Sequence, residues 1–177
     1  KLWQVRITKE IATALLNGIV HDTDSLSNPA TSYGALKAAS ALIAMGARFG
    51  EIKSNQLKNK SVDLLKVWGV AFQRLRLNFR YQIAYTVLTA ADLTQHGLKA
   101  ESSMGLVNFF NELSGVKAVI LLTEQGAGFI QVSMRTTSDD FDLSRLAKAS
   151  GGGGHQKAAG FTVKGQLVYN GNSWKIV

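Results

Sequence analysis

The chain has 177 residues, 46% of them hydrophobic, and its 20 Lys and Arg against 12 Asp and Glu give a formal charge of +8. Such a composition is ordinary for a soluble globular protein of one compact domain or two small ones. The charge favours anionic partners such as nucleic acids, nucleotides or acidic proteins. The absence of cysteine excludes disulfides, thiolate zinc sites and cysteine nucleophiles, so any metal must take carboxylate and imidazole ligands, which suits ions such as manganese.

The sequence contains no candidate membrane segment. No apolar run approaches the roughly 20 residues that a membrane-spanning helix needs, and the first residues lack the order of a secretory signal peptide. We therefore expect no membrane association and a cytoplasmic location.

The first part of the chain has helical patterns. Residues 11–20 predict an apolar helix that ends in a polar turn containing Pro29. Residues 32–45 predict a second helix, closed by Gly46 as a C-terminal cap. Residues 51–80 contain seven basic and two acidic side chains and predict a connecting helix with a basic outer surface. Its apolar face would consist of Leu64, Leu65, Trp68, Phe72 and Leu75.

The pattern changes near Leu75, where apolar and polar residues alternate up to Tyr85 as in a strand or tight hairpin. A second domain is expected to begin there. The following segments predict a helix at 102–115 with Ser102 or Ser103 as its cap, strands at 116–123 and 128–135, a helix from Asp142 and a further strand from about 158. This order of elements indicates an α/β domain with a mixed sheet.

Four glycines, 151–154, separate that last helix from the strand and are followed at once by His155. A flexible linker is a poor explanation, because the residues after His155 are too few for a domain. Two interpretations stay open. The segment can be a tight turn with an exposed histidine, or successive glycines can let backbone N–H groups approach an anion, with a short following helix, His155 and Lys157 as further donors.

The stretch "SGGGGHQKAAGF", together with the preceding "IQVSMRTTSDDFDLSRLAKA", resembles the Gly-Gly-Gly-His motif of the DHH-associated domain of DHH-family phosphoesterases. The stretches "IAYTVLT" and "GLVNFF" are similar to the first strand and a helix of that domain. In addition, "GIVHDTDSLSNPAT" is similar to the last motif of the DHH catalytic domain. The resemblance covers nearly the whole chain and is strongest to the bacterial oligoribonuclease and phosphoadenosine-phosphate phosphatase branch.

The resemblance implies an α/β fold in which residues 1–69 form the helical end of a doubly wound DHH domain plus a connecting helix, and residues 70–177 form the substrate-binding domain. It implies that Asp22 is a catalytic residue and a ligand of Mn²⁺ in a two-metal centre. His21 and Asp24 stand where the family usually has Thr and Gly. The residues that the resemblance assigns to substrate binding are Arg135, Gly152, Gly153, Gly154 and His155.

The family's Asp-x-Asp and Asp-His-His motifs occur nowhere in the chain, so we expect the remaining metal ligands upstream and little activity from the chain alone. The helices of residues 1–60 should then have unpartnered apolar faces. Two functions remain open at this point. One is a manganese-dependent phosphoesterase acting on short oligoribonucleotides or nucleotide phosphates, and the other is a non-catalytic module that binds nucleotides or single-stranded RNA or DNA.

Overall fold

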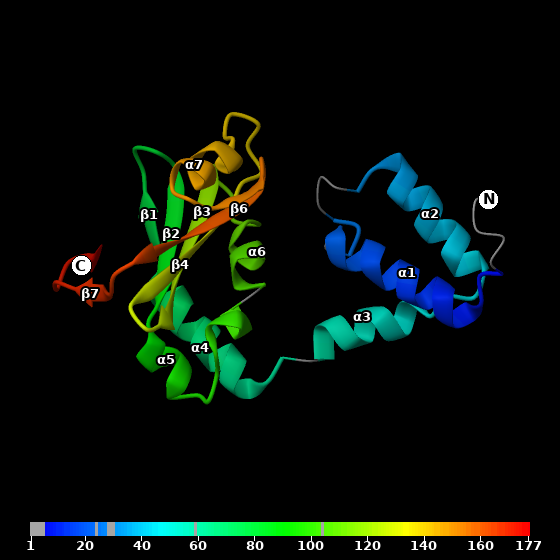
Figure 1. Cartoon of the computed structure of the whole chain (residues 1–177), viewed down its shortest axis with the longest axis horizontal. Coiled ribbons are helices and arrows are strands. Elements are labelled where there is room, and N and C mark those ends of the chain that lie inside the picture. Colours follow the sequence, from blue (N-terminus) through cyan, green and yellow to red (C-terminus); the bar gives the residue numbers. More distant parts are fainter. Residues whose placement is uncertain (1–5, 24, 28–30, 59, 104) are drawn as a thin grey trace. The chain divides into compact units, whose positions relative to one another are not determined.

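The structure is a computed structural model, and it describes residues 6–23, 25–27, 31–58, 60–103 and 105–177. Asp24 and Pro29, which belong to the turn expected after the first helix, lie outside these described residues. Contacts between Cα atoms divide the chain into two compact units, Lys1–Lys60 and Ser61–Val177. Both units are drawn in Figure 1, and each is described here by itself.

The first unit contains three helices in its described part, namely α1 (Lys9–Asp22), α2 (Tyr33–Ala44) and α3 (Phe49–Lys58). Thr8 and Ser32 cap the first two, because each side-chain oxygen accepts a hydrogen bond from a backbone N–H of the first turn. The core of this unit is a single cluster of buried side chains from α1, α2, α3 and the connection before α3, comprising Ala12, Leu16, Val20, Ala39, Leu42, Ala47 and Ile52.

Large apolar side chains on α1 and α2 remain exposed. Ile11 and Leu15 lie four residues apart and so share one face of α1, and they are 39% and 50% exposed. On α2, Leu36 and Ile43 are 47% and 44% exposed. Both helices therefore have exposed apolar side chains among the described residues, as expected.

In the part of the chain that the structure describes, the second unit is built on a six-stranded sheet of order β1-β2-β3-β4-β6-β5. The strands are β1 (Arg76–Asn78), β2 (Ile83–Leu88), β3 (Ala118–Gly126), β4 (Phe129–Arg135), β6 (Ala158–Lys164) and β5 (Gly153–His155). The helices are α4 (Val62–Gln73), α5 (Ala90–Thr94), the 3-10 helix η1 (Ala100–Ser103), α6 (Leu106–Phe110) and α7 (Leu143–Ala149), and a hairpin of β7 (Leu167–Tyr169) and β8 (Trp174–Ile176) follows.

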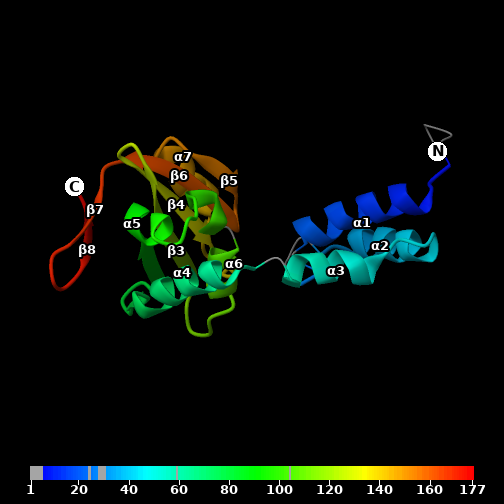
Figure 2. The same cartoon turned by 90° about the horizontal axis from the view of Figure 1, so that it is seen from below.

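Strands β2 and β3 are parallel, whereas the other paired strands of the sheet are antiparallel. The connection between β2 and β3 contains α5, η1 and α6. Figure 2 shows α4 on one side of the strands and α7 on the other. One core lies under α4 and α6, and a second lies under α7. The expected α/β fold with a mixed sheet is therefore confirmed.

The predicted connecting helix of residues 51–80 was wrong in two respects. Residues 49–73 form two helices, because Ser61 caps α4 as a new helix. Of the predicted apolar face, Trp68 is buried and Leu64 and Leu75 pack against the core, but Leu65 and Phe72 are exposed, and Val67 and Ala71 are buried in their place. Since α4 packs into the core of the second unit, the boundary between the two contact-defined units lies at 60/61.

The helix expected over residues 102–115 is shorter than its apolar pattern suggests. Ser102 and Ser103 belong to η1, and Gly105, with a φ of 95°, is the N-cap of α6 and makes no side-chain cap hydrogen bond. The prediction of Ser102 or Ser103 as the cap was therefore wrong. The two strands expected at 116–123 and 128–135 are confirmed as β3 and β4, joined by a turn with Gly126 and Gly128 at positive φ.

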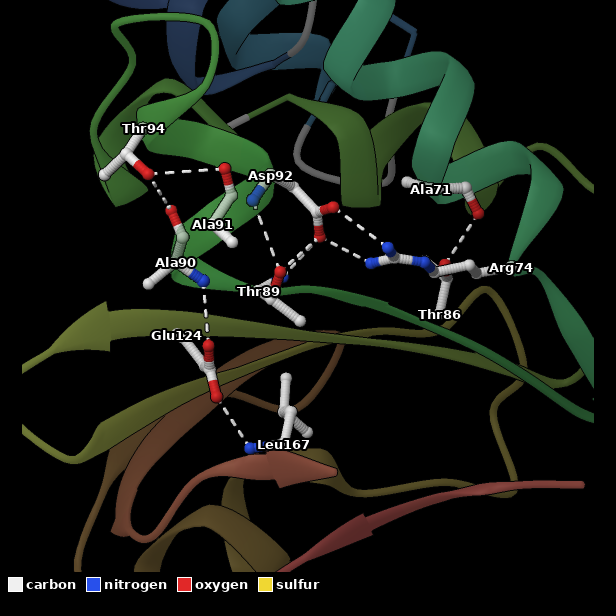
Figure 3. Close-up of polar contacts among 10 residues, drawn as sticks. All are labelled: Ala71, Arg74, Thr86, Thr89, Ala90, Ala91, Asp92, Thr94, Glu124 and Leu167. Atoms are coloured by element: carbon white, nitrogen blue, oxygen red, sulfur yellow. Dashed lines mark hydrogen bonds and ion pairs between the residues drawn. The ribbon is translucent and has the colours of Figure 1, made fainter. Parts of the chain in front are cut away.

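A polar network joins the elements around one end of β2 and β3 (Figure 3). Arg74, the C-cap of α4, donates two hydrogen bonds to the Asp92 carboxylate, at 2.5 and 2.9 Å, and Asp92 also accepts from the Thr89 backbone N–H. Glu124 of β3 accepts from the Ala90 N–H at 2.8 Å with one oxygen and from the Leu167 N–H at 2.6 Å with the other. This network fixes α5 against α4 and attaches β7 to the sheet.

Candidate functional site

The four glycines have different structural roles, and the first two end α7. Gly151 has a φ of 77°, and its N–H donates to the carbonyl of Lys148, while the Gly152 N–H donates to the carbonyl of Ala147. This pair of hydrogen bonds is the Schellman arrangement, which places a left-handed residue just after a helix. Gly151 is therefore explained by the helix end.

Gly152 and Gly154 are explained by close packing against β6. A Cβ on Gly152 would lie 2.2 Å from the Gly160 carbonyl oxygen and 2.5 Å from the Phe161 Cβ. Gly154 has a φ of 134°, and a Cβ there would lie 2.5 Å from both the Ala158 carbonyl oxygen and the Ala159 Cα. Side chains at either position would overlap with the strand.

Gly153 differs from both neighbours. Nothing lies within 4 Å of the position that its Cβ would occupy, and its φ is outside the left-handed region. Packing within the described residues gives no reason for a glycine here. An exposed backbone without a Cβ is, however, what a ligand needs for close approach to the main chain. Gly153 is therefore the glycine of this run to which a ligand-binding role best applies.

The glycines continue into the strand β5, so a short following helix does not contribute N–H donors to the anion-binding interpretation. His155 lies in β5 and is paired with Ala158 of β6, and Ala158 is paired with Arg135 of β4. Directly paired residues of neighbouring strands point to the same face of a sheet. His155 and Arg135 therefore share one face and are separated by about two strand spacings, or about 10 Å.

The surface between these two side chains is flat. Gly153 is paired with Gly160, and Gly160 with Ser133, so the neighbouring row on the same face also has small side chains or none. Ala158, Gly160 and Ser133 are half-buried, while Gly153 and His155 are exposed. A phosphate can approach this surface closely, with an imidazole on one side and a guanidinium on the other.

Arg135 is held by a residue that the sequence patterns did not single out. Its Nε donates to Asn108 Oδ1 at 2.8 Å, and its Nη1 donates to the Met134 carbonyl at 2.9 Å. Asn108 lies on α6, which packs against β3 and β4. The stretch "GLVNFF" carried part of the resemblance, but only the fold brings its asparagine to the arginine. Asn108 orients the guanidinium plane, which suits a group that contacts phosphate through parallel N–H donors.

Lys157 has a different role from the one predicted for it. Its Nζ donates to the Ser138 carbonyl at 2.6 Å and to Asp139 Oδ1 at 2.5 Å. That hydrogen bond lowers the pKa of the Asp139 carboxyl. Lys157 therefore anchors the connection between β4 and α7 and does not point its charge at the glycine segment. The cap predicted at Asp142 is confirmed, because its Oδ1 accepts from the Ser144 and Arg145 N–H groups.

Asp22 lies in the first unit, whereas the other candidate residues lie in the second. It is the last residue of α1, is exposed, and is preceded by the exposed His21. Thr23 follows as the helix C-cap, and its buried hydroxyl donates to the Ile19 carbonyl at 2.6 Å. Ser25 and Leu26 have φ values of 61° and 66°, a conformation that costs energy for residues other than glycine.

Metal ligation can be tested on the donor set of the described residues. Among them, no group of three His, Asp or Glu side chains is placed to hold a metal ion. Asp22 thus supplies one candidate ligand and does not form a metal centre with described neighbours. Likewise, no helix in the described part of the chain is long and apolar enough to cross a membrane.

The second unit is thus a mixed-sheet α/β domain with an arginine and a histidine facing a glycine-lined surface. A family profile described as the DHHA1 domain matches residues 80–170, and the chain belongs to that family. The matched stretch runs from the β1–β2 turn to just after β7.

Several known proteins are similar to the chain. It is 27% identical over 161 residues to the bifunctional oligoribonuclease and PAP phosphatase NrnA of Thermus thermophilus, covering 91% of this chain and 47% of that protein. The NrnA of Bacillus subtilis is also 27% identical, over 89% of this chain and 49% of its own length. The chain therefore spans about half the length of these curated relatives.

A solved structure supports the fold. An exopolyphosphatase-related protein from Bacteroides fragilis superposes with a TM-score of 0.79 at 23% sequence identity, and the match covers 94% of this chain and 47% of that one. Because the match extends over both units, the fold of residues 6–60 is also similar to part of that protein. At this identity the likeness concerns the fold alone.

Proposed function

We propose that the chain is part of a DHH-family phosphoesterase that hydrolyses short oligoribonucleotides or nucleotide phosphates, and that its second unit binds the substrate. The observation that carries the proposal is the placement of Arg135 and His155 on one face of the sheet, on either side of Ala158 and beside the open Gly153. Membership of the DHHA1 family and the names of the two NrnA relatives support the same substrate class.

In this proposal each residue has a defined role toward a phosphate group. The Arg135 guanidinium, oriented by Asn108, donates hydrogen bonds to phosphate oxygens. His155 adds an imidazole N–H donor from the opposite side. Gly153 offers a backbone that a phosphate can approach without meeting a Cβ. We also assign Gly152 and Gly154 to substrate binding, because they allow residues 152–155 to lie close against β6.

The catalytic part of the proposal concerns Asp22. Its carboxylate would be one ligand of a Mn²⁺ pair, with further ligands outside the described residues. Bound in this way, the ions would activate a water molecule and neutralise charge on the phosphate. We also propose that residues 1–69 comprise the helical end of a DHH catalytic domain and a connecting helix, which is the part of α4 that packs into the core of the second unit. The exposed faces of α1 and α2 are consistent with packing onto a sheet of that domain.

Binding can be tested with the 177-residue chain by calorimetric titration with a 5′-phosphorylated diribonucleotide at fixed salt, since a basic chain binds any polyanion at low ionic strength. Arg135→Ala and His155→Ala should each weaken binding by about 1.5–3 kcal/mol, the scale of hydrogen bonds to charged groups. Lys164→Ala, which removes a charge at the opposite end of β6, serves as the control and should have little effect. Unchanged affinity in both test variants would refute the binding assignment.

Hydrolysis needs a separate test, with the longer natural protein and Mn²⁺. Asp22→Ala should abolish turnover there while leaving diribonucleotide binding by the 177-residue chain unchanged. The 177-residue chain by itself should show negligible turnover, because one carboxylate cannot hold two ions. Binding without any hydrolysis by the longer protein would favour a non-catalytic nucleotide-binding module instead.

A further inference from the structure

The turn between β1 and β2 presents two aromatic side chains to solvent. Phe79 is 83% exposed and Tyr81 is 54% exposed. Phe79 is the most exposed of the large hydrophobic side chains in the described part of the chain. These rings are not part of the packed core of the domain, so their exposure in a turn calls for another explanation.

The turn is held in a fixed conformation by hydrogen bonds. Asn78 Oδ1 accepts from the Tyr81 backbone N–H, and the Gln82 carbonyl accepts from the Lys117 N–H at 2.7 Å. Gln82 itself has a φ of 53°, the left-handed conformation that closes the turn. A surface that is already ordered loses less conformational entropy when a ligand binds. The turn therefore offers its aromatic rings from a preorganised backbone.

A cation lies beside the rings. Arg80 is placed over the Tyr81 ring at 5.4 Å from its centroid, whereas Arg76 donates to the Gln73 and Leu75 carbonyls at the other end of β1. Among the residues that the structure describes, no carboxylate is within salt-bridge distance of the Arg80 guanidinium. Exposed aromatic rings interleaved with arginines are the features by which proteins bind single-stranded nucleic acids, since bases stack on the rings and the cations meet the phosphates.

The turn lies at the same end of the sheet as the Arg135–His155 surface. The Gln82 carbonyl accepts from the Lys117 N–H, the Lys117 carbonyl accepts from Thr136 Oγ1, and the Thr136 N–H donates to the Lys157 carbonyl. These hydrogen bonds form a continuous rim from the turn to the β5–β6 connection. Figure 1 shows the β1–β2 turn and the connection from β4 to α7 at the upper end of the sheet.

The strand order gives the length of this rim. Leu77 belongs to one row of paired residues that runs through Ala84, Val119, Arg135 and Ala158 to His155. At about 4.8 Å per strand, Leu77 is about 14 Å from Arg135 and about 24 Å from His155. A stacked strand advances about 3.4 Å per nucleotide, so it spans these distances with about four and about seven nucleotides. A dinucleotide held at Arg135 is too short to reach the turn.

We propose that Phe79 and Tyr81 form a base-stacking platform for a single-stranded oligonucleotide whose phosphate is held by Arg135 and His155. The proposal rests on the proposed function and extends it, because it assigns a second contact region and makes binding depend on strand length. Arg80 neutralises a phosphate next to the stacked bases. Lys117 lies on the rim between the two regions, where Asp140, at 3.8 Å, partly offsets its charge.

The test compares two probes on the 177-residue chain by fluorescence anisotropy at fixed salt, a diribonucleotide and a heptaribonucleotide, both 5′-phosphorylated. The double variant Phe79→Ala/Tyr81→Ala should weaken heptamer binding about tenfold or more and leave dimer binding unchanged. Phe129→Ala is the matched control, since Phe129 is 43% exposed at the opposite end of β4 and should change neither. A heptamer whose nucleotides beyond the phosphate bound at Arg135 lack bases should bind the wild-type chain and the double variant equally.

The outcomes separate the platform from the binding surface. Equal heptamer affinity in the wild-type chain and the double variant would overturn the platform, and the proposed function would stand if Arg135→Ala still weakened dimer binding. No measurable binding of either probe by the wild-type chain would overturn both. Loss of dimer and heptamer binding together in the double variant would also contradict the platform. A circular-dichroism melt of the double variant should match the wild-type chain, because both rings are exposed.

Discussion

Replacing the glycines one at a time should separate their structural roles from ligand binding. In Gly152→Ala the new Cβ would lie 2.2 Å from the Gly160 carbonyl oxygen, whereas ordinary contacts begin near 3.4 Å. The neighbouring atoms belong to the backbone of β6, which cannot turn aside as a side chain can. Overpacking of this kind typically costs about 1–3 kcal/mol. Gly154→Ala should cost at least as much, since its φ of 134° adds backbone strain.

Gly153→Ala should behave in the opposite way. Its Cβ meets nothing within 4 Å, so alanine should leave the free energy of unfolding unchanged or raise it by about 0.4–1 kcal/mol by restricting the unfolded chain. The difference in unfolding free energy between Gly152→Ala and Gly153→Ala should therefore be about 1–4 kcal/mol.

Urea denaturation followed by tryptophan fluorescence measures this difference, because Trp68 and Trp174 both belong to the second unit. Calorimetric titration with the diribonucleotide adds the second readout, in which Gly153→Val should weaken binding while the unfolding midpoint stays near that of the wild-type chain. Equal destabilisation by Gly152→Ala and Gly153→Ala would refute the assignment of roles within the segment. A stable Gly153→Val that binds normally would show that the open position is not used by the ligand.

Three further predictions concern the surrounding structure. Burial raises the pKa of Asp92, but hydrogen bonds from Arg74 and Thr89 outweigh burial and hold that pKa below its ordinary value. The stability that the ionised carboxylate provides should be present above about pH 4 and should be lost as the pH falls through the lower pKa of the folded state. In Asp92→Asn, the urea midpoint should therefore depend less on pH between about pH 2 and 6. At pH 7 the same change should lower the free energy of unfolding in urea by about 2 kcal/mol, since it removes one partner of a half-buried ion pair. Asp139→Asn is the control, because that carboxylate is almost fully exposed, and it should change the unfolding free energy little. Glu124→Ala should release the β7–β8 hairpin, measured as faster amide exchange at Leu167 with the rest of the sheet still protected. Asn108→Ala should raise the Kd for the diribonucleotide several-fold without a comparable loss of stability, and an unchanged Kd would show that Arg135 needs no orienting partner.

The sequence predicted the elements whose pattern is local. The alternation after Leu75, the glycine-closed turn between β3 and β4 and the cap at Asp142 depend on residues that are close in the chain, so each could be identified in advance. The motif around His155 likewise carried the family resemblance, which the DHHA1 match to residues 80–170 confirms. The α/β fold followed from the order of these elements.

Helix boundaries and buried faces were predicted less well, because neighbours distant in sequence determine them. The spacing of Leu65 and Phe72 indicated that they belong to a buried stripe of α4, yet both are exposed, since the position of β2 favours Val67 and Ala71 instead. The helix expected over 102–115 is confined to a short α6 because a left-handed Gly105 begins it.

Only the tertiary structure distinguished the glycines from one another. In the sequence Gly152, Gly153 and Gly154 are equivalent, but β6 passes close to the first and third and leaves the second open. Strand pairing also decided that Arg135 and His155 share a face, and helix packing decided that Asn108 meets the arginine. A sequence determines these relationships only through the register and packing of segments that are far apart along the chain, whereas composition and local pattern determine which residues are available to take part.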